Sequence, residues 1–155
     1  MRCIVLASIL LGACGQLPET TTVGRVAAWS DGAVDGPTLE RGCAAWTAIG
    51  VDCAVVQDRA SANVVVSSYA DSSSGARLGW EDGHAATVVT LWVNLAMQQS
   101  SDTLAATVAH EIGHALGLGH LDTGPAVMNT GANQYDWPVL TSTDIAGYQA
   151  LYGAR

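Results

Sequence analysis

The chain has 155 residues, with fourteen acidic side chains against six arginines and a formal net charge of −8. This length allows one domain with a modest core, and the charge excludes a nucleic-acid surface, which needs clustered positive residues. The acidic residues are scattered along the chain, which indicates a solvated surface and identifies no partner.

Residues 1–13 are typical of an export signal. Arg2 provides a positive charge, and residues 4–13 form an apolar stretch that is too short to cross a bilayer as a helix. The stretch runs into Leu11-Gly12-Ala13-Cys14, which resembles a bacterial lipobox, in which the cysteine is acylated and becomes the first mature residue. The alternative is an ordinary secretory peptide that is cut nearby. In either case the mature protein leaves the cytosol.

A short tether and one folded domain are expected after the signal. Residues 14–22 are polar and aperiodic, so a lipid on Cys14 would hold the domain, residues 23–155, away from a bacterial membrane. Gly15 stands where lipoproteins of the inner membrane commonly carry Asp. We therefore expect an outer-membrane lipoprotein, on the periplasmic or the cell-surface face, with secretion as the alternative.

The first half of the domain combines several strand-like runs with one helix. Asp35-Gly36-Pro37 is a helix start, because a proline in the first turn lacks an N–H that would have no helical partner there. Gly50 is a plausible stop for the same helix. Runs rich in β-branched residues predict strands over residues 51–57, 63–69 and 86–94. Residues 23–29 and the short run 76–80 are weaker strand candidates.

Two cysteines of the domain fall in neighbouring elements, Cys43 in the predicted helix and Cys53 in the strand that follows Gly50. A helix–turn–strand hairpin of this length can bring two Cα atoms within disulfide range, and an exported compartment permits the bond. The alternative is a pair of buried thiols. A cysteine-based zinc site is not expected, since two isolated cysteines lack C-x-x-C spacing.

The second half of the domain changes to a helical period. Apolar residues within 104–115 recur on one side of a helix that Ser101 or Asp102 can cap. A last helix begins at Thr141, with Asp144 three residues later in a capping-box arrangement. Strands come first and helices last, which favours an α+β fold.

Residues 110–120 read HEIGHALGLGH and contain the candidate metal-binding and catalytic residues. On a helix, His110 and His114 lie about 40° apart, one turn above the other, so both imidazoles can bind one metal ion. Glu111 lies about 60° round from His114, beside the ion, where a base can reach a water on the metal. Gly117 lets the chain leave the helix in a left-handed conformation, which returns His120 as a third ligand. Three protein ligands leave a fourth position open, as in catalytic zinc sites.

This pattern is specific. At average residue usage, the third histidine and the glycine lower its chance occurrence to the order of one in 10⁵ for a chain of this length. Three unrelated histidines at a helix end are one alternative. A zinc site that has lost its activity is another, and the intact Glu111 argues against it.

The spacing H-E-x-x-H-x-x-G-x-x-H resembles the metzincin signature, and the chain looks most like the matrixin branch of that group. Met128 stands eight residues after His120, similar to the Met-turn that lies beneath the metal in the family, with an ordinary core methionine as the alternative. Residues 140–153 (LTSTDIAGYQALYG) resemble the C-terminal helix of matrixin catalytic domains.

This resemblance implies a fold and an activity. The fold would be a twisted, mostly parallel five-stranded sheet with two packed helices, the second carrying the zinc motif, then the Met-turn and the C-terminal helix. One catalytic Zn²⁺ on the three histidines would hydrolyse peptide bonds, with Glu111 as general base. A sheet edge at Leu78 and Gly79 would pair with an extended protein or peptide substrate. A plain surface hairpin is the alternative for that edge.

The chain also departs from the matrixin pattern. After Met128 it reads Asn-Thr-Gly, without the Pro-x-Tyr wall of the family's main specificity pocket and without the extra tyrosine ligand of astacins. His84 is the one histidine outside the motif and no His-x-Asp pair exists, so the family's second, structural zinc is not expected. Structural Ca²⁺ remains open, with no sequence feature that supports it.

Two acidic residues are candidates for supporting roles. Asp122 follows the third ligand and would orient His120 by accepting a hydrogen bond, or it would be a turn residue before Gly124-Pro125. Asp144 stands where a matrixin residue seats the mature N-terminal region. A lipidated N-terminus has no free ammonium for that contact, which weakens this role here.

Together these observations predict a monomeric zinc metalloendopeptidase that acts on proteins or peptides and binds no nucleic acid. Two alternatives belong to other classes of protein. One is a zinc-bearing surface lipoprotein that binds peptides without cleaving them, and the other is a lipoprotein whose zinc is structural.

Overall fold

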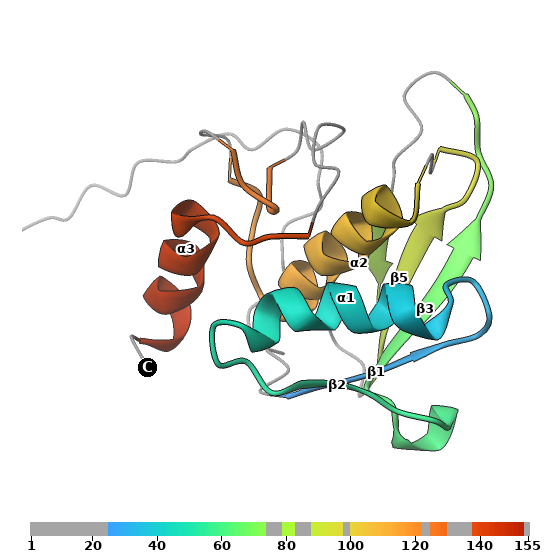
Figure 1. Ribbon diagram of the computed structural model, residues 1–155, viewed down its shortest axis with the longest axis horizontal. Coiled ribbons are helices and arrows are strands. Elements are labelled where there is room, and N and C mark those ends of the chain that lie inside the picture. Colours follow the sequence, from blue (N-terminus) through green and yellow to red (C-terminus); the bar gives the residue numbers. More distant parts are fainter. Residues whose placement is uncertain are drawn as a thin grey trace, which may run out of the picture.

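A computed structural model of the chain describes residues 25–73, 79–82, 88–97, 100–121, 125–129 and 138–153. Within these ranges the protein has the predicted α+β fold, with helices α1 and α2 packed side by side against a sheet (Figure 1). The elements in chain order are β1 (Val26–Ser30), α1 (Gly36–Thr47), β2 (Cys53–Val55), the short 3₁₀ helix η1 (Arg59–Ser61), β3 (Val64–Tyr69), β4 (Gly79–Asp82), β5 (Val89–Asn94), α2 (Ser101–Ala115) and α3 (Ser142–Tyr152).

The sheet has the strand order β2-β1-β3-β5-β4. Four strands are parallel, and β4 pairs antiparallel with β5 at one edge. The strand expected at residues 76–80 is observed as β4, from Gly79 to Asp82, and residues 74–78 lie outside the described ranges. Pairing with β5, in which Gly79 lies opposite Val93, sets the position of β4, and this register is not readable from the residues of β4 alone.

The middle strands β3 and β5 supply the apolar core of the sheet. Residues 64–66 of β3 are all buried, as expected for a central strand of a parallel sheet. In β5, buried Val89, Leu91 and Val93 alternate with half-buried residues, so one face of this strand is turned to the interior.

Helix α1 begins and ends at the predicted signals. Asp35 is its N-cap, and the Asp35 carboxylate accepts a hydrogen bond from the Thr38 N–H at 2.9 Å. Gly50, in the turn after the helix, has a φ of 89°, a left-handed conformation that favours glycine. The face of α1 turned to the core carries Leu39, Cys43 and Trp46.

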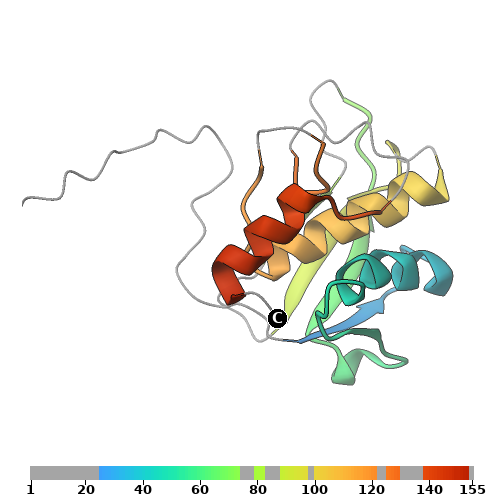
Figure 2. The same cartoon turned by 60° about the vertical axis from the view of Figure 1, so that its left-hand side comes forward.

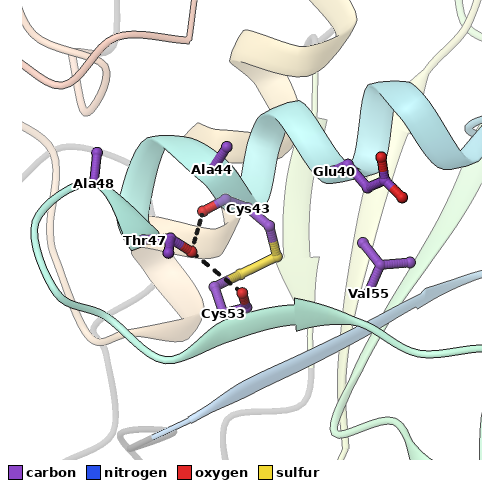
Figure 3. Close-up of a pocket in the computed structure, with 7 residues that line it drawn as sticks. All are labelled: Glu40, Cys43, Ala44, Thr47, Ala48, Cys53 and Val55. Carbon is purple, nitrogen blue, oxygen red and sulfur yellow. Dashed lines mark hydrogen bonds between the residues drawn. A yellow bond between two sulfur atoms is a disulfide. The ribbon is translucent and has the colours of Figure 1, made fainter.

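A disulfide joins Cys43 of α1 to Cys53 of β2, with the two Cα atoms 5.4 Å apart (Figure 3). The hydroxyl oxygen of Thr47 lies 3.2 Å from the carbonyl oxygen of each cysteine, so this side chain connects the same helix and strand. Strand β2 is the edge of the sheet opposite β4. The crosslink therefore fastens α1 to the edge that is farthest from β4 in strand order.

The N-cap of α2 is Ser100, which corrects the prediction of Ser101 or Asp102. The Ser100 hydroxyl accepts a hydrogen bond from the Thr103 N–H at 3.0 Å. Asp102 instead uses its carboxylate for an ion pair with Arg41 of α1. This contact across the two helices is not readable from the sequence.

Helix α3 starts with the predicted capping box, in which Thr141 and Asp144 each bond to the backbone N–H of the other. It lies beside the C-terminal end of α2, where Tyr152 reaches the carbonyl of Leu116 (Figure 2). Among the described residues, no helix is both long enough and apolar enough to cross a membrane.

Loss of the disulfide is expected to lower the free energy of unfolding by on the order of 3 kcal/mol, because the open chain gains entropy mainly when unfolded. The double variant Cys43→Ser/Cys53→Ser should melt below the oxidised parent, and reductant should not lower its melting temperature further. Thermal unfolding followed by circular dichroism measures both effects. Parent protein purified without reductant whose two cysteines are both freely alkylated would contradict the prediction.

Candidate metal centre

Helix α2 and the turn that follows it bring three histidines together. Gly117 has a φ of 87°, the left-handed conformation that was predicted for the helix exit. The Gly117 N–H donates to the His114 carbonyl at 2.8 Å, and the Leu118 N–H donates to the Gly113 carbonyl at 2.9 Å. These two bonds form a Schellman motif, which turns the chain back so that His120 faces the end of the helix.

The Nε2 atoms of the three histidines form a nearly equilateral triangle. The separations are 3.1 Å between His110 and His114, 3.2 Å between His114 and His120, and 3.3 Å between His110 and His120. Tetrahedral zinc with bonds of about 2.0–2.1 Å to nitrogen separates two of its ligands by about 3.3 Å. The three predicted ligands therefore have the spacing and the chemistry that a zinc ion requires.

Backbone carbonyls orient two of the rings. His110 Nδ1 lies 2.6 Å from the Val127 carbonyl oxygen, and His114 Nδ1 lies 2.8 Å from that of Leu118. A carbonyl oxygen can only accept, so each Nδ1 carries the proton and donates it. In the neutral form of each ring, Nε2 is then the unprotonated nitrogen, and its lone pair is free to bind a metal ion. A hydrogen bond from Nδ1 to a backbone carbonyl is a common way to fix a metal-binding histidine in one tautomer.

Burial favours the neutral form of His110. Desolvation by burial is the main cause that lowers the pKa of His110 from 6.5 to about 4; the neighbouring His120 acts in the same direction, whereas the hydrogen bond to the Val127 carbonyl and the charge of Asp144 act in the opposite direction. At pH 7 the His110 ring is therefore uncharged, which is the form that coordinates a metal.

Glu111 is buried, with 3% of its surface exposed, and the edge strand β4 lies against it. A Cβ atom built on Gly79 would lie 2.8 Å from Glu111 Oε1 and 2.8 Å from the Trp92 carbonyl oxygen, closer than real Cβ contacts allow. The backbone of Gly79, a predicted substrate-edge residue, therefore packs on the Glu111 carboxylate. A larger residue at position 79 would displace either the carboxylate or strand β4. The other predicted edge residue, Leu78, lies outside the described residues.

Met128 lies in the core against α2, where a Met-turn was expected. Its side chain is fully buried, and a Cβ atom on Gly113 would collide with the Met128 sulfur. Trp46 of α1 approaches the same glycine, and its indole N–H donates to the Ala109 carbonyl at 2.8 Å. The glycine between the two helix-borne histidines thus allows a methionine and a tryptophan to support that turn of the helix.

Asp144 ties α3 to the Met128 segment. It is fully buried, and its carboxylate accepts hydrogen bonds from the N–H groups of Val127 at 3.0 Å and Met128 at 2.9 Å, besides its two bonds to Thr141. The carboxylate therefore holds the peptide that supplies the acceptor for His110. The predicted contact of Asp144 with the N-terminal region involves residues outside the described ranges and stays a prediction.

Several residues of the site were not found by sequence reasoning, and others cannot be placed. The carbonyls of Leu118 and Val127 have no sequence signal, because every residue carries a carbonyl, and Trp46 belongs to no recognisable motif. Asp122, the predicted acceptor for His120, and Cys14, the predicted lipidation site, lie outside the described residues.

The lowered pKa of His110 predicts how the metal-free protein responds to acid. Its folded pKa of about 4 is below the unfolded value of 6.5, so between these values the unfolded chain binds a proton that the folded chain does not. The stabilising effect of the neutral ring is present above pH 6.5 and is lost as the pH falls toward 4. Protonation of His110 should therefore lower the free energy of unfolding by about 3 kcal/mol as the pH falls from 6.5 to 4.

Urea unfolding in the presence of a chelator, at several pH values between 7 and 4, measures this dependence. The His110→Asn variant is the control, because it removes the titrating group and should show a shallower slope. Equal slopes in the parent and in this variant would show that His110 is not the group responsible.

Comparison with known proteins identifies the family. The sequence profile of the matrixin family matches residues 52–153. Matrix metalloproteinase-23 of Homo sapiens is 44% identical over 50 residues, which are 32% of this chain and 13% of that protein. Metalloendoproteinase 2-MMP of Arabidopsis thaliana is 44% identical over 56 residues, 34% of this chain and 14% of the relative. The chain thus matches a small part of these longer relatives. Because the family profile spans most of the chain and includes the three histidines and Glu111, this protein belongs to the matrixin family.

Proposed function

We propose that this protein is a zinc-dependent endopeptidase. The observation that carries the proposal is the triangle of Nε2 atoms on the three histidines, next in sequence to the buried carboxylate of Glu111. Its membership of the matrixin family, and relatives that are named as a metalloproteinase and a metalloendoproteinase, support the class of reaction.

The roles of the residues follow from their chemistry. His110, His114 and His120 would hold one Zn²⁺ and leave a coordination position open. When bound, the ion polarises the scissile carbonyl and lowers the pKa of water at that position. Glu111 takes the proton from the attacking water and later gives it to the leaving amine. Its burial keeps this proton transfer away from bulk solvent.

The edge strand β4 is the proposed binding surface for the substrate. Among the described strands it pairs with one neighbour, β5, so its other side can accept an extended peptide as an added strand. Gly79 of this strand packs directly on Glu111. A peptide paired along β4 would therefore run past the general base. Peptide binding without cleavage would use the same edge, and turnover of a peptide library by the purified domain separates the two functions.

The variant Glu111→Ala tests the mechanism. Because Glu111 is a base and not a ligand in this proposal, the variant should retain close to one zinc per chain. Its rate of peptide hydrolysis should fall at least about 10²-fold, the usual contribution of a general base. Metal analysis and steady-state kinetics measure the two properties on the same sample.

Glu40→Ala is the matched control for this experiment, because Glu40 is an exposed carboxylate on α1. It should leave both zinc content and rate close to those of the parent. A Glu111→Ala protein that hydrolyses peptides as fast as the parent would overturn the mechanism.

We also propose, from the sequence of residues 1–22, that the protein is exported and held to an outer membrane by a lipid on Cys14. The apolar stretch, the Leu11-Gly12-Ala13-Cys14 sequence and the polar tether support this proposal. A protease anchored in this way would act on proteins or peptides outside the cytosol, as a monomer. Secretion without a lipid would leave the proposed reaction unchanged.

The variant Cys14→Ser tests the anchor. The parent should fractionate with membranes, because each buried CH₂ of an acyl chain contributes about 0.8 kcal/mol, whereas the variant should not be processed as a lipoprotein. Mass spectrometry of the mature N-terminus is the deciding measurement. An unmodified N-terminus downstream of residue 14 would place the protein in the secreted class.

A further inference from the structure

The end of α2 exposes a backbone carbonyl that the helix itself cannot satisfy. In the Schellman motif, the carbonyls of Gly113 and His114 receive N–H groups from the turn. The Leu116 carbonyl, at the last position before Gly117, instead accepts a hydrogen bond from the Tyr152 hydroxyl at 2.6 Å. Tyr152 is the last residue of α3, so a side chain 36 positions away closes the exit of the metal-binding helix.

The turn that this bond restrains serves two of the three histidines. The Leu118 carbonyl, two residues after Leu116, accepts the Nδ1 proton of His114. His120 follows two residues later, and its Nε2 completes the triangle. Rotation of the Leu116–Gly117 peptide would therefore move both the acceptor that orients one ligand and the backbone that carries another.

The same loop is anchored at its other end through α3. The Leu121 N–H donates to the Met128 carbonyl at 2.8 Å, and the Met128 N–H donates to the carboxylate of Asp144. Residues 116–121 thus lie between two attachments, Tyr152 and Asp144, and both belong to α3. The first attachment is a single hydroxyl, which a conservative substitution can remove alone.

The ring of Tyr152 is held independently of its hydroxyl. It packs on the ring of Tyr148 with centroids 4.7 Å apart, and Tyr148 in turn lies 6.2 Å from Trp46 in the core. A phenylalanine at position 152 would keep this packing. The hydrogen bond to Leu116 can therefore be separated from the stability of α3.

We infer that Tyr152 is a positioning residue of the metal centre, whose hydroxyl sets the turn that directs His114 and His120. This inference rests on the proposed function, because it assumes that the three histidines bind zinc. Tyr152 touches neither the metal nor the substrate in this arrangement. Its effect should therefore appear in metal affinity and in the geometry of the bound ion, and only through these in the rate.

The test compares Tyr152→Phe with Tyr148→Phe, which removes the same atom from the same helix one turn earlier. Zinc affinity is measured by competition with a chromophoric chelator, and thermal unfolding is measured for the zinc-free and the zinc-loaded protein. Cobalt(II) in place of zinc gives a visible spectrum that reports the arrangement of the ligands. Tyr152→Phe should bind zinc roughly three- to tenfold more weakly, the effect of one neutral hydrogen bond, with altered cobalt bands.

In the control, Tyr148→Phe, zinc affinity should stay within about twofold of the parent, since this substitution keeps the ring that packs on Tyr152 and leaves the bond from Tyr152 to Leu116 in place. A Tyr152→Phe protein with parental zinc affinity and cobalt spectrum, and with equal losses of melting temperature in both forms, would overturn the inference. So would a variant that does not fold, because the hydroxyl would then support the whole fold and not the turn.

The same measurements keep the two proposals apart. A parent protein that binds zinc but cleaves no peptide would refute the proposed reaction and leave the role of Tyr152 to be decided by the affinities. A parent that binds no zinc would refute the metal centre, and this inference with it.

Discussion

The convergence of three imidazole Nε2 atoms to within 3.1–3.3 Å of one another is the constraint on which the rest of the site depends. Unprotonated nitrogens at this distance repel each other unless a cation lies among them, so other contacts must hold the rings. For His110 and His114 these contacts are Nδ1–H groups donated to backbone carbonyls. The geometry of this candidate metal centre therefore depends on two turns of the chain as much as on the helix that carries the motif.

Both turns are bonded to α3. Burying the carboxylate of Asp144 would be costly without partners, and four hydrogen bonds, two of them to the Met128 segment, compensate for the lost hydration. Tyr152 completes the other turn. A helix that contributes none of the three histidines is thus bonded to both turns next to them. The methionine itself fits beneath α2 because position 113 has no side chain.

The disulfide and the proposed general base lie near opposite edges of the sheet. The disulfide fastens α1 to β2 at one edge, whereas Gly79 of β4 packs on Glu111 at the other. A small domain has a limited core and gains from a covalent crosslink. At this position the crosslink restrains the fold without restraining the edge at which we propose that the substrate binds.

The amino-acid sequence by itself determined the features that arise within short segments. The helical spacing of His110 and His114, the left-handed Gly117, the capping box of α3 and the helix–turn–strand hairpin that pairs Cys43 with Cys53 are all set by residues close together in the chain. The class of fold and the three-histidine site could be predicted for this reason.

Only the tertiary structure decided which backbone groups face which side chains. The Val127 carbonyl behind His110, the approach of Gly79 to Glu111 and the bond from Tyr152 to Leu116 each join segments between 17 and 36 residues apart. Every residue has a carbonyl, so its partner depends on the register and packing of whole elements and not on residue type. The ion pair between Asp102 and Arg41 follows the same rule, since it forms across two helices.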